Sequence, residues 1–150
     1  MGHISEILSR AKARGKEMNL PYTGAFLPRE AYAILTATPA AKLVDVRTRA
    51  ELDWVGRIPG SNQIEWMSYP GMQPNANFVN QLQQQVDMES LVMFICRSGQ
   101  RSHNAAAIAA QSGYAECYNV LEGFEGDKDV AKHRNATNGW RHAGLPWEQT

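Results

Sequence analysis

The sequence has little cysteine. Its two cysteines, Cys96 and Cys117, are too few for the disulfide framework of a small secreted domain. With no third or fourth thiol they do not suit a structural zinc site, and the four histidines show neither i, i+4 pairing nor a neighbouring cysteine pair. We therefore expect no metal, and each cysteine has to be interpreted separately.

An excess of either charge is also absent, because fifteen basic and fifteen acidic residues give a formal net charge of zero. Such a chain has no overall basic field, so we expect neither nucleic acid nor a membrane as a partner. Long apolar runs are missing too: the longest, Leu91–Cys96, is far too short to cross a bilayer. Early charges such as Glu6 and Arg10 leave no room for a secretory signal. The sequence predicts a soluble, cytoplasmic protein with one compact core.

Short apolar runs separated by helical patterns indicate an α/β fold. Leu43–Val46 and Leu91–Ile95 are apolar without alternation, which is typical of parallel strands buried on both faces. A third strand is expected at Cys117–Leu121 and a weaker one around Gln63–Ile64. The predicted architecture is an open, mainly parallel sheet of about five strands with helices on both faces. Helices are expected at residues 28–38, 50–54, 75–86 and 102–112.

The beginning of the chain is polar, and we interpret residues 1–26 as a leader that precedes a catalytic domain at residues 27–150. Apolar residues between Ile4 and Ala11 fall at helical spacing. They predict one short amphipathic helix, ended by Gly15, that docks on the domain.

The strongest functional signal is the loop from Cys96 to Arg101, which joins a buried strand to an alanine-rich helix beginning near Ser102. Ligands of open α/β sheets bind at the carboxyl ends of strands, where Cys96 stands. Small and cationic residues entering a helix can curl their backbone N–H groups into an anion cradle, and Gly99 permits the curl. This field, with Arg97 and Arg101, favours the thiolate of Cys96. We therefore prefer a reactive nucleophile to an inert core thiol.

Further motifs occur in a defined order along the chain. They are Leu43-Val44-Asp45-Val46-Arg47, Glu51, Gly56-Arg57-Ile58-Pro59-Gly60, Cys96 to Ser102, Gly113-Tyr114, Asn119-Val120-Leu121-Glu122-Gly123, and Trp140 with Ala143-Gly144-Leu145-Pro146. In this order they resemble the signatures of rhodanese domains, the single-domain thiosulfate sulfurtransferases, over about residues 27–147.

The resemblance implies a sulfurtransferase that needs no cofactor. Cys96 would attack the sulfane sulfur of a small anionic donor such as thiosulfate, release sulfite and hold a persulfide. A thiophilic acceptor, such as cyanide, a thiol or a protein thiol, would then remove the sulfur. The resemblance also assigns Asp45, Arg47 and Glu51 to a structural polar network. The implied substrate cradle consists of Arg97, Ser98, Gly99, Gln100, Arg101 and Ser102.

Two features depart from the family pattern. Arg57 replaces the usual histidine before Ile-Pro-Gly, and we expect a changed structural hydrogen bond. Glu125–Thr137 is an extra polar segment between Phe124 and Trp140. It follows a strand at the same sheet edge as Cys96, so it is either a partial lid or docking surface for a protein thiol, or a surface insertion without a role.

Several other side chains have an ordinary interpretation beside a functional one. We interpret Cys117 as a buried core thiol rather than a resolving cysteine, and His103 as facing solvent rather than tuning Cys96. The loop at residues 66–74 either overhangs the active site or simply packs. Its large side chains are Trp66, Met67, Tyr69 and Met72. The tryptophans expected only in packing are Trp54, Trp140 and Trp147.

Two other functions stay open. Cysteine and arginine on an anion-binding loop are also the apparatus of Cys-based phosphatases and arsenate reductases. In those phosphatases the loop between the cysteine and the arginine is longer than the loop from Cys96 to Arg101. In addition, Ile95 stands where a histidine often precedes their cysteine. The other alternative is a non-catalytic rhodanese-like binding module, which the retained Cys96 and its loop make the weaker hypothesis.

Overall fold

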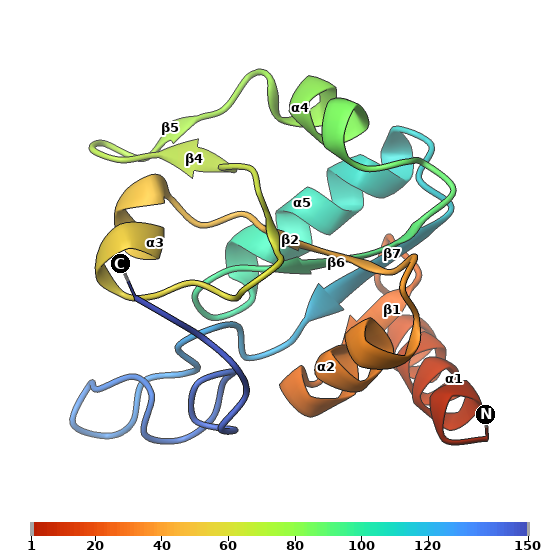
Figure 1. Ribbon diagram of the computed structural model, residues 1–150, viewed down its shortest axis with the longest axis horizontal. Helices are drawn as coiled ribbons and strands as arrows, with labels where there is room; N and C mark the ends of the chain where they lie inside the picture. Colours follow the sequence, from red (N-terminus) through yellow and green to blue (C-terminus); the bar gives the residue numbers. More distant parts are fainter. Residues whose placement is uncertain (1, 150) are drawn as a thin grey trace.

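The computed structural model describes residues 2–149, and a parallel sheet between two layers of helices forms its centre (Figure 1). Five strands lie in the order β1-β7-β6-β2-β3, and each neighbouring pair is parallel. The predicted α/β architecture is therefore confirmed. The strands are β1 (Gly24–Phe26), β2 (Lys42–Asp45), β3 (Asn62–Gln63), β6 (Leu91–Ile95) and β7 (Glu116–Val120).

The central strand β6 is buried on both faces because its successive side chains point to opposite sides of the sheet. Met93 and Ile95 enter the core beneath α1 and α2, whereas Val92 and Phe94 enter the core beneath α4 and α5 (Figure 1). This is why β6 has no alternating polar positions. The helices are α1 (Gly2–Glu17), α2 (Pro28–Ala37), α3 (Arg49–Trp54), α4 (Phe78–Gln85) and α5 (Gln100–Gln111).

Helix α1 packs closely against β1. Gly24 has no Cβ to collide with the carbonyl group of Ala11, and Gly15 lies against the backbone of Thr23 in the same way. The helix continues past Gly15 to Glu17, so the predicted end at Gly15 is wrong: this glycine allows close packing instead. The boundary expected after residue 26 falls between β1 and α2.

The remaining expected elements are present within a few residues of their predicted limits. The loop at residues 66–74 contains a short antiparallel hairpin of β4 (Met67–Ser68) and β5 (Gln73–Pro74). Gly113 follows α5 with a φ of 107°, the left-handed conformation expected of a glycine that ends a helix. Between residues 2 and 149, no helix has the length and apolar character needed to cross a membrane.

Candidate active site

Cys96 directly follows β6 at the carboxyl edge of the sheet, and its side chain is only 1% exposed. The chain then reverses before α5 begins at Gln100. The turn depends on Gly99, whose φ of 111° is readily adopted only by glycine. This conformation aims the N–H of Gly99 at Cys96 Sγ, at 3.1 Å. The loop therefore curls around the sulfur at Gly99, as the sequence predicts.

Ser102 and Asn119 form a polar layer beneath the curled loop. Ser102 Oγ lies 3.3 Å from Cys96 Sγ and 2.5 Å from Asn119 Oδ1, and Asn119 Nδ2 donates to the carbonyl oxygen of Gly99 at 3.2 Å. Asn119 projects from β7 and is 4% exposed. It therefore fixes both groups that contact the sulfur. The residue patterns alone gave it no individual role, although a polar side chain inside a buried strand was a usable signal.

A second support comes from the turn after β7. The N–H of Phe124 donates to the carbonyl of Cys96 at 2.8 Å, and the N–H of Glu125 donates to the carbonyl of Arg97 at 3.0 Å. Gly123 makes this possible, because a Cβ there would lie 2.6 Å from the carbonyl oxygens of Cys96 and Arg97. The carbonyls of Cys96 and Arg97 are therefore bonded to the turn after β7, while the N–H of Gly99 faces the sulfur.

Arg101 is paired, which corrects the expectation of two free cations around Cys96. Its guanidinium forms a bidentate pair with Glu51 at 2.7 and 2.9 Å. Glu51 also caps α3 by accepting from the N–H of Thr48. Burial alone would raise the pKa of Glu51, but Arg101, together with the Thr48 bonds, lowers it to about 2. Glu51 therefore belongs to the site as well as to the predicted structural network.

Arg97 is exposed, and within residues 2–149 its side chain has no ion-pair partner. It is therefore the cation of the loop that is available to an anion. Ser98 is partly exposed, and Gln100 is exposed at the first position of α5. Neither is seen in contact with the sulfur, so their predicted role in binding substrate stays a prediction.

Asp45 and Arg47 form a second acid–arginine pair near the loop, and both side chains are fully buried. Arg47 Nη2 also donates to the carbonyl of Gly56 at 2.9 Å, and the guanidinium lies 4.1 Å from the centre of the Phe124 ring. The pair holds the end of β2, the residues after α3 and the turn after β7 together. This is the structural role predicted for these two residues.

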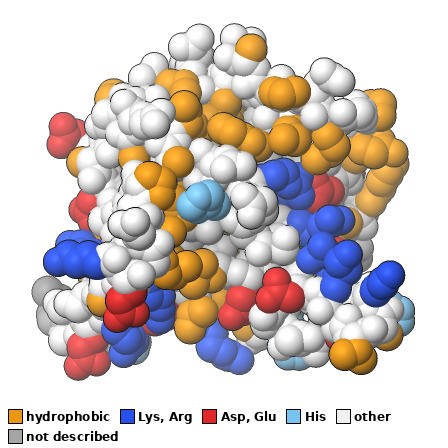
Figure 2. Space-filling view, turned by 180° about the vertical axis from the view of Figure 1, so that it is seen from behind, with side chains coloured by type: hydrophobic (Ala, Val, Ile, Leu, Met, Phe, Trp, Pro, Cys, Tyr) orange, Lys and Arg blue, Asp and Glu red, His pale blue; other side chains and the backbone are white. Residues whose placement is uncertain are grey.

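A cavity of about 460 Å³ opens beside the loop, between α3 and the tip of the β4–β5 hairpin. Cys96 is not on its wall, although Arg97 and Arg101 are. Figure 2 shows hydrophobic side chains gathered at the upper right, where the hairpin lies, above a group of basic and acidic ones. The lining residues are Thr48, Ala50, Glu51, Trp54, Val55, Tyr69, Met72, Arg97, Arg101 and Glu125.

The large side chains that border the cavity are not all those that the sequence predicted. Trp54, expected in packing, is 73% exposed and borders the cavity, because the last turn of α3 presents it outward. Tyr69 and Met72 border the same cavity, whereas Trp66 packs edge-on against Phe78. Trp140 is fully buried, as predicted, and Trp147 contacts Gly56 and Phe124 at the edge.

Cys117 is buried in the core, and His103 is hydrogen-bonded to a neighbouring side chain. Cys117 is fully buried, as predicted, and burial raises the pKa of its thiol to about 12. Cys117 lies opposite Val92 in the sheet, and Val92 is four residues before Cys96. At about 3.3 Å per residue, Val92 and Cys96 are about 13 Å apart along the strand. A disulfide between the two cysteines is therefore excluded in this fold. His103 does not simply face solvent, because its Nδ1 lies 2.7 Å from the hydroxyl of Tyr22.

The two departures from the family pattern lie on the surface. Arg57 pairs with Asp53 on α3, and its backbone bridges that of Glu148. In the extra segment, the carboxylate of Asp129 accepts from the N–H of His133 at 2.9 Å and shapes a turn. Glu125 is the member of Glu125–Thr137 that borders the cavity beside Cys96.

Comparison with known proteins agrees with this geometry. A parallel α/β sheet that carries a cysteine on a curled loop ahead of a helix is the arrangement expected of a rhodanese-like domain. The protein-family model for the rhodanese-like domain matches residues 27–129 of the chain. The chain therefore belongs to the rhodanese-like domain family. In residues 2–149, no three His, Cys, Asp or Glu side chains come together where a metal ion could be held.

Three similar proteins cover most of the chain. The uncharacterized RP600 homolog of Rickettsia rickettsii is 36% identical over 121 residues, which are 79% of this chain and 92% of the relative. The thiosulfate sulfurtransferase GlpE of Actinobacillus succinogenes is 30% identical over 111 residues, 74% of this chain and 78% of that protein. The crystal structure of Rv0390 from M. tuberculosis has a TM-score of 0.79 and 40% identity, covering 86% of this chain and 99% of Rv0390.

Proposed function

We propose that this protein is a sulfurtransferase that moves sulfane sulfur from thiosulfate or a related donor to a thiophilic acceptor through a persulfide on Cys96. The observation that carries the proposal is the position of Cys96 Sγ, which accepts a hydrogen bond from the N–H of Gly99 at the entrance to α5. A backbone donor and a helix amino terminus both stabilise negative charge on sulfur. The same contacts support the thiolate before transfer and the anionic persulfide after it.

In the first half of the reaction the Cys96 thiolate attacks the sulfane sulfur of thiosulfate. A bond forms between Sγ and that sulfur, the sulfur–sulfur bond of the donor breaks, and its electron pair leaves with sulfite. Arg97, which is exposed and unpaired among residues 2–149, supports binding of the dianion. Charge is conserved, because the thiolate and the dianionic donor become a persulfide anion and sulfite.

In the second half an acceptor attacks the terminal sulfur of the persulfide, and Cys96 returns to the thiolate. Cyanide would leave as thiocyanate, and a thiol or protein thiol would leave as a persulfide. Because Cys96 is 1% exposed and off the cavity wall, reactants reach it only when neighbouring side chains move. Arg97 and the Glu51–Arg101 pair border the cavity beside Cys96. They are therefore the side chains whose movement would open a path to the sulfur. We place the reaction in the cytoplasm, where free thiols stay reduced.

Steady-state formation of thiocyanate from thiosulfate and cyanide tests the proposal. We expect turnover that follows the concentration of both substrates in a double-displacement pattern. An aryl phosphate, assayed in parallel, should not be hydrolysed. Phosphate release without sulfur transfer would favour a phosphatase, and activity on neither substrate would favour a non-catalytic binding module.

A further inference from the structure

The polar layer beneath the cysteine loop continues beyond Ser102 and Asn119. Besides its contacts with Ser102 and the carbonyl of Gly99, Asn119 forms a hydrogen bond with the hydroxyl of Tyr22. That hydroxyl lies 2.7 Å from Nδ1 of His103, which is half-buried on α5. A chain of polar contacts therefore leads from the groups around the sulfur to a histidine at the edge of solvent. The proposed reaction gives no role to the last two members of this chain.

Tyr22 belongs to the leader, because it precedes residues 27–129, which match the family model. The next residue, Thr23, is bonded twice to β7: its N–H donates to the carbonyl of Cys117 at 3.0 Å, and its Oγ1 accepts from the N–H of Cys117 at 3.0 Å. Strand β1 then continues beside β7 (Figure 1). Tyr22 is 8% exposed, and its ring meets that of His103 edge-on, with centroids 5.3 Å apart. The leader thus holds this phenol in a fixed position.

The direction of the hydrogen bonds around Tyr22 follows from its chemistry. Burial raises the pKa of Tyr22 to about 12, although the hydrogen bond with Asn119 lowers it, as expected when an amide donates to the phenol oxygen. The phenol therefore keeps its proton at neutral pH. With its oxygen accepting from Asn119, it donates that proton to Nδ1 of His103, so Nε2 carries the proton of the imidazole. Each side of the Asn119 amide then has one role, with its oxygen toward Ser102 and its NH₂ group toward Gly99 and Tyr22.

The orientation of the Asn119 amide matters because it holds both groups that contact the sulfur of Cys96. If the amide turned over, its oxygen would face the carbonyl oxygen of Gly99, and the bond that fixes this carbonyl would be lost. Its NH₂ group would face Ser102 instead. Tyr22 opposes this rotation, because its oxygen accepts from the NH₂ group, and a buried donor left without a partner is costly.

We infer that Tyr22 and His103 are positioning residues for the Cys96 loop, acting through Asn119, and that the leader is therefore part of the active site. The inference rests on the proposed function. Tyr22 holds the amide, and His103 holds the phenol by accepting its proton. Loss of either leaves Cys96 in place but loosens the donors around its sulfur. We therefore expect a slower attack on a bound donor rather than weaker binding of that donor.

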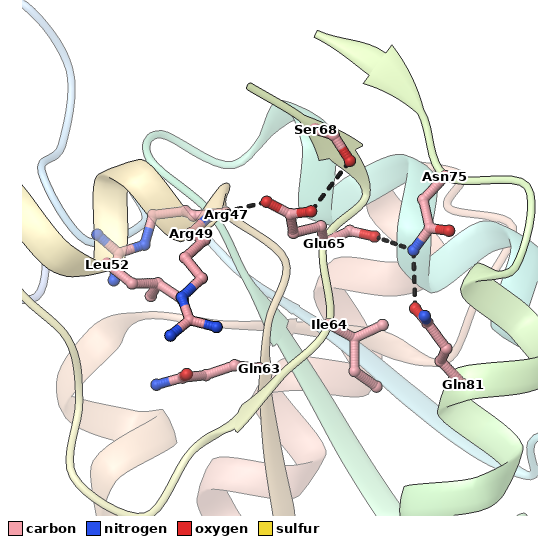
Figure 3. A pocket seen from close by; sticks show the side chains of 9 residues that line it. All are labelled: Arg47, Arg49, Leu52, Gln63, Ile64, Glu65, Ser68, Asn75 and Gln81. Carbon is pink, nitrogen blue, oxygen red and sulfur yellow. Dashed lines mark hydrogen bonds between the residues drawn. The ribbon is translucent and has the colours of Figure 1, made fainter. Parts of the chain in front are cut away.

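A second polar cluster provides a contrast, and it borders a pocket of about 360 Å³ beside β3 (Figure 3). There Asn75 Nδ2 donates to the carbonyl of Glu65 at 2.7 Å. The Glu65 carboxylate accepts from Ser68 Oγ at 3.0 Å and from the first N–H of α3 at 2.8 Å. These bonds join the β4–β5 hairpin to α3. Ser68→Ala therefore removes a hydroxyl from a polar cluster that braces the hairpin, and it leaves the contacts of Asn119 unchanged.

Tyr22→Phe tests the inference in the full chain, because it removes the hydroxyl and keeps the ring. We expect the kcat of thiocyanate formation to fall by about three- to tenfold, as for one lost hydrogen bond, with the KM for thiosulfate nearly unchanged. Alkylation of Cys96 by iodoacetamide, which needs no sulfur transfer, should slow by a similar factor. Tyr114→Phe is the matched control, since the buried hydroxyl of Tyr114 donates to the carbonyl of Val86 at 2.7 Å. Tyr114→Phe and Ser68→Ala should change neither rate.

Two substitutions of His103 separate positioning from packing. His103→Asn places an amide oxygen near the position of Nδ1, where it can accept from Tyr22, whereas His103→Leu offers no acceptor. We expect His103→Asn to keep most of the activity and His103→Leu to lose as much as Tyr22→Phe. Circular dichroism and thermal unfolding establish that each variant is folded.

The outcomes distinguish this inference from the proposed function. Unchanged kcat and alkylation rates in Tyr22→Phe and His103→Leu would overturn the inference alone, and so would an equal loss in Tyr114→Phe. Absence of sulfur transfer in the wild-type protein, with alkylation slowed in both variants, would overturn the proposed function. That result would still support the positioning of Cys96 by Tyr22.

Discussion

Cys96 and Cys117 pack in the same hydrophobic core and are almost equally buried, but their polar surroundings differ. Cys96 Sγ accepts from the N–H of Gly99 at 3.1 Å and lies at the entrance to a helix. Cys117 lies within β7, and its thiol donates to the carbonyl of Tyr114 at 3.9 Å. A carbonyl cannot donate to a thiolate. We therefore expect the orientation of neighbouring donors, rather than burial alone, to decide which of the two cysteines is reactive.

The largest effect is expected for Cys96→Ser. A serine hydroxyl is nearly isosteric with the thiol but cannot hold a persulfide, so thiocyanate formation should fall by at least about 10³-fold, in keeping with the loss of a covalent nucleophile. Chemical denaturation should show a folded variant. Turnover at the parental rate would remove the distinction between the two cysteines.

Arg101→Gln tests whether the paired arginine contributes to donor binding. Because Arg101 is already paired with Glu51, its loss should weaken thiosulfate binding by less than the loss of Arg97, for which we expect about 1.5–3 kcal/mol. The measurement is the KM for thiosulfate, with the KM for the acceptor as the reference. Arg97→Gln is the matched variant, because it removes the exposed cation instead. An equal rise in KM for both variants would mean that Arg101 binds the donor as strongly as Arg97 does.

Asn119→Asp changes the polar layer beneath the loop while Cys96 stays in place. The variant loses the amide that donates to the carbonyl of Gly99 at 3.2 Å. Loss of a buried hydrogen bond should destabilise the transition state by about 1–3 kcal/mol, so we expect kcat to fall by about 5- to 150-fold. The pH profile of alkylation at Cys96 should shift as well, which a purely structural role would not produce. Asn135→Asp, an exposed change in the extra segment, should have neither effect.

The Glu51–Arg101 pair should make stability depend on pH. The pKa of Glu51 falls from its ordinary value of 4.5 to about 2 in the folded protein. Its contribution to the free energy of unfolding is therefore present above about pH 4.5 and lost as the pH falls toward 2. At neutral pH this contribution is on the order of 2–3 kcal/mol. Urea unfolding of wild type and Glu51→Gln should differ at pH 7 and converge near pH 2. A constant difference would mean that the pair does not stabilise the fold.

The smallest effect on activity is expected for Cys117→Ser. Cys117 is too far along the sheet to reach Cys96, so thiocyanate formation should stay near the wild-type rate. Stability should drop by about 1–3 kcal/mol, because a hydroxyl is placed in an apolar core. A loss of activity as large as that of Cys96→Ser would give Cys117 a direct role in transfer.

The sequence predicted the fold and the cysteine loop well, because both depend on local signals. Leu91–Ile95 is apolar throughout, and Gly99 marks the turn. The pairing of Arg101 with Glu51 was missed, because it joins residues far apart in the sequence. Strand β1 was missed for a similar reason: three residues, Gly24–Phe26, form a strand only because β7 offers a partner. Trp54 was misplaced because the direction in which α3 faces is set by tertiary packing.

Intact-mass spectrometry after incubation with thiosulfate would detect a persulfide on Cys96 as added mass. The wild-type protein and Cys117→Ser should each gain the mass of one sulfur atom, and a reducing agent should remove it. Cys96→Ser should gain nothing. Added sulfur in Cys96→Ser, or none in the folded wild-type protein under conditions that permit turnover, would show that Cys96 does not carry the transferred sulfur.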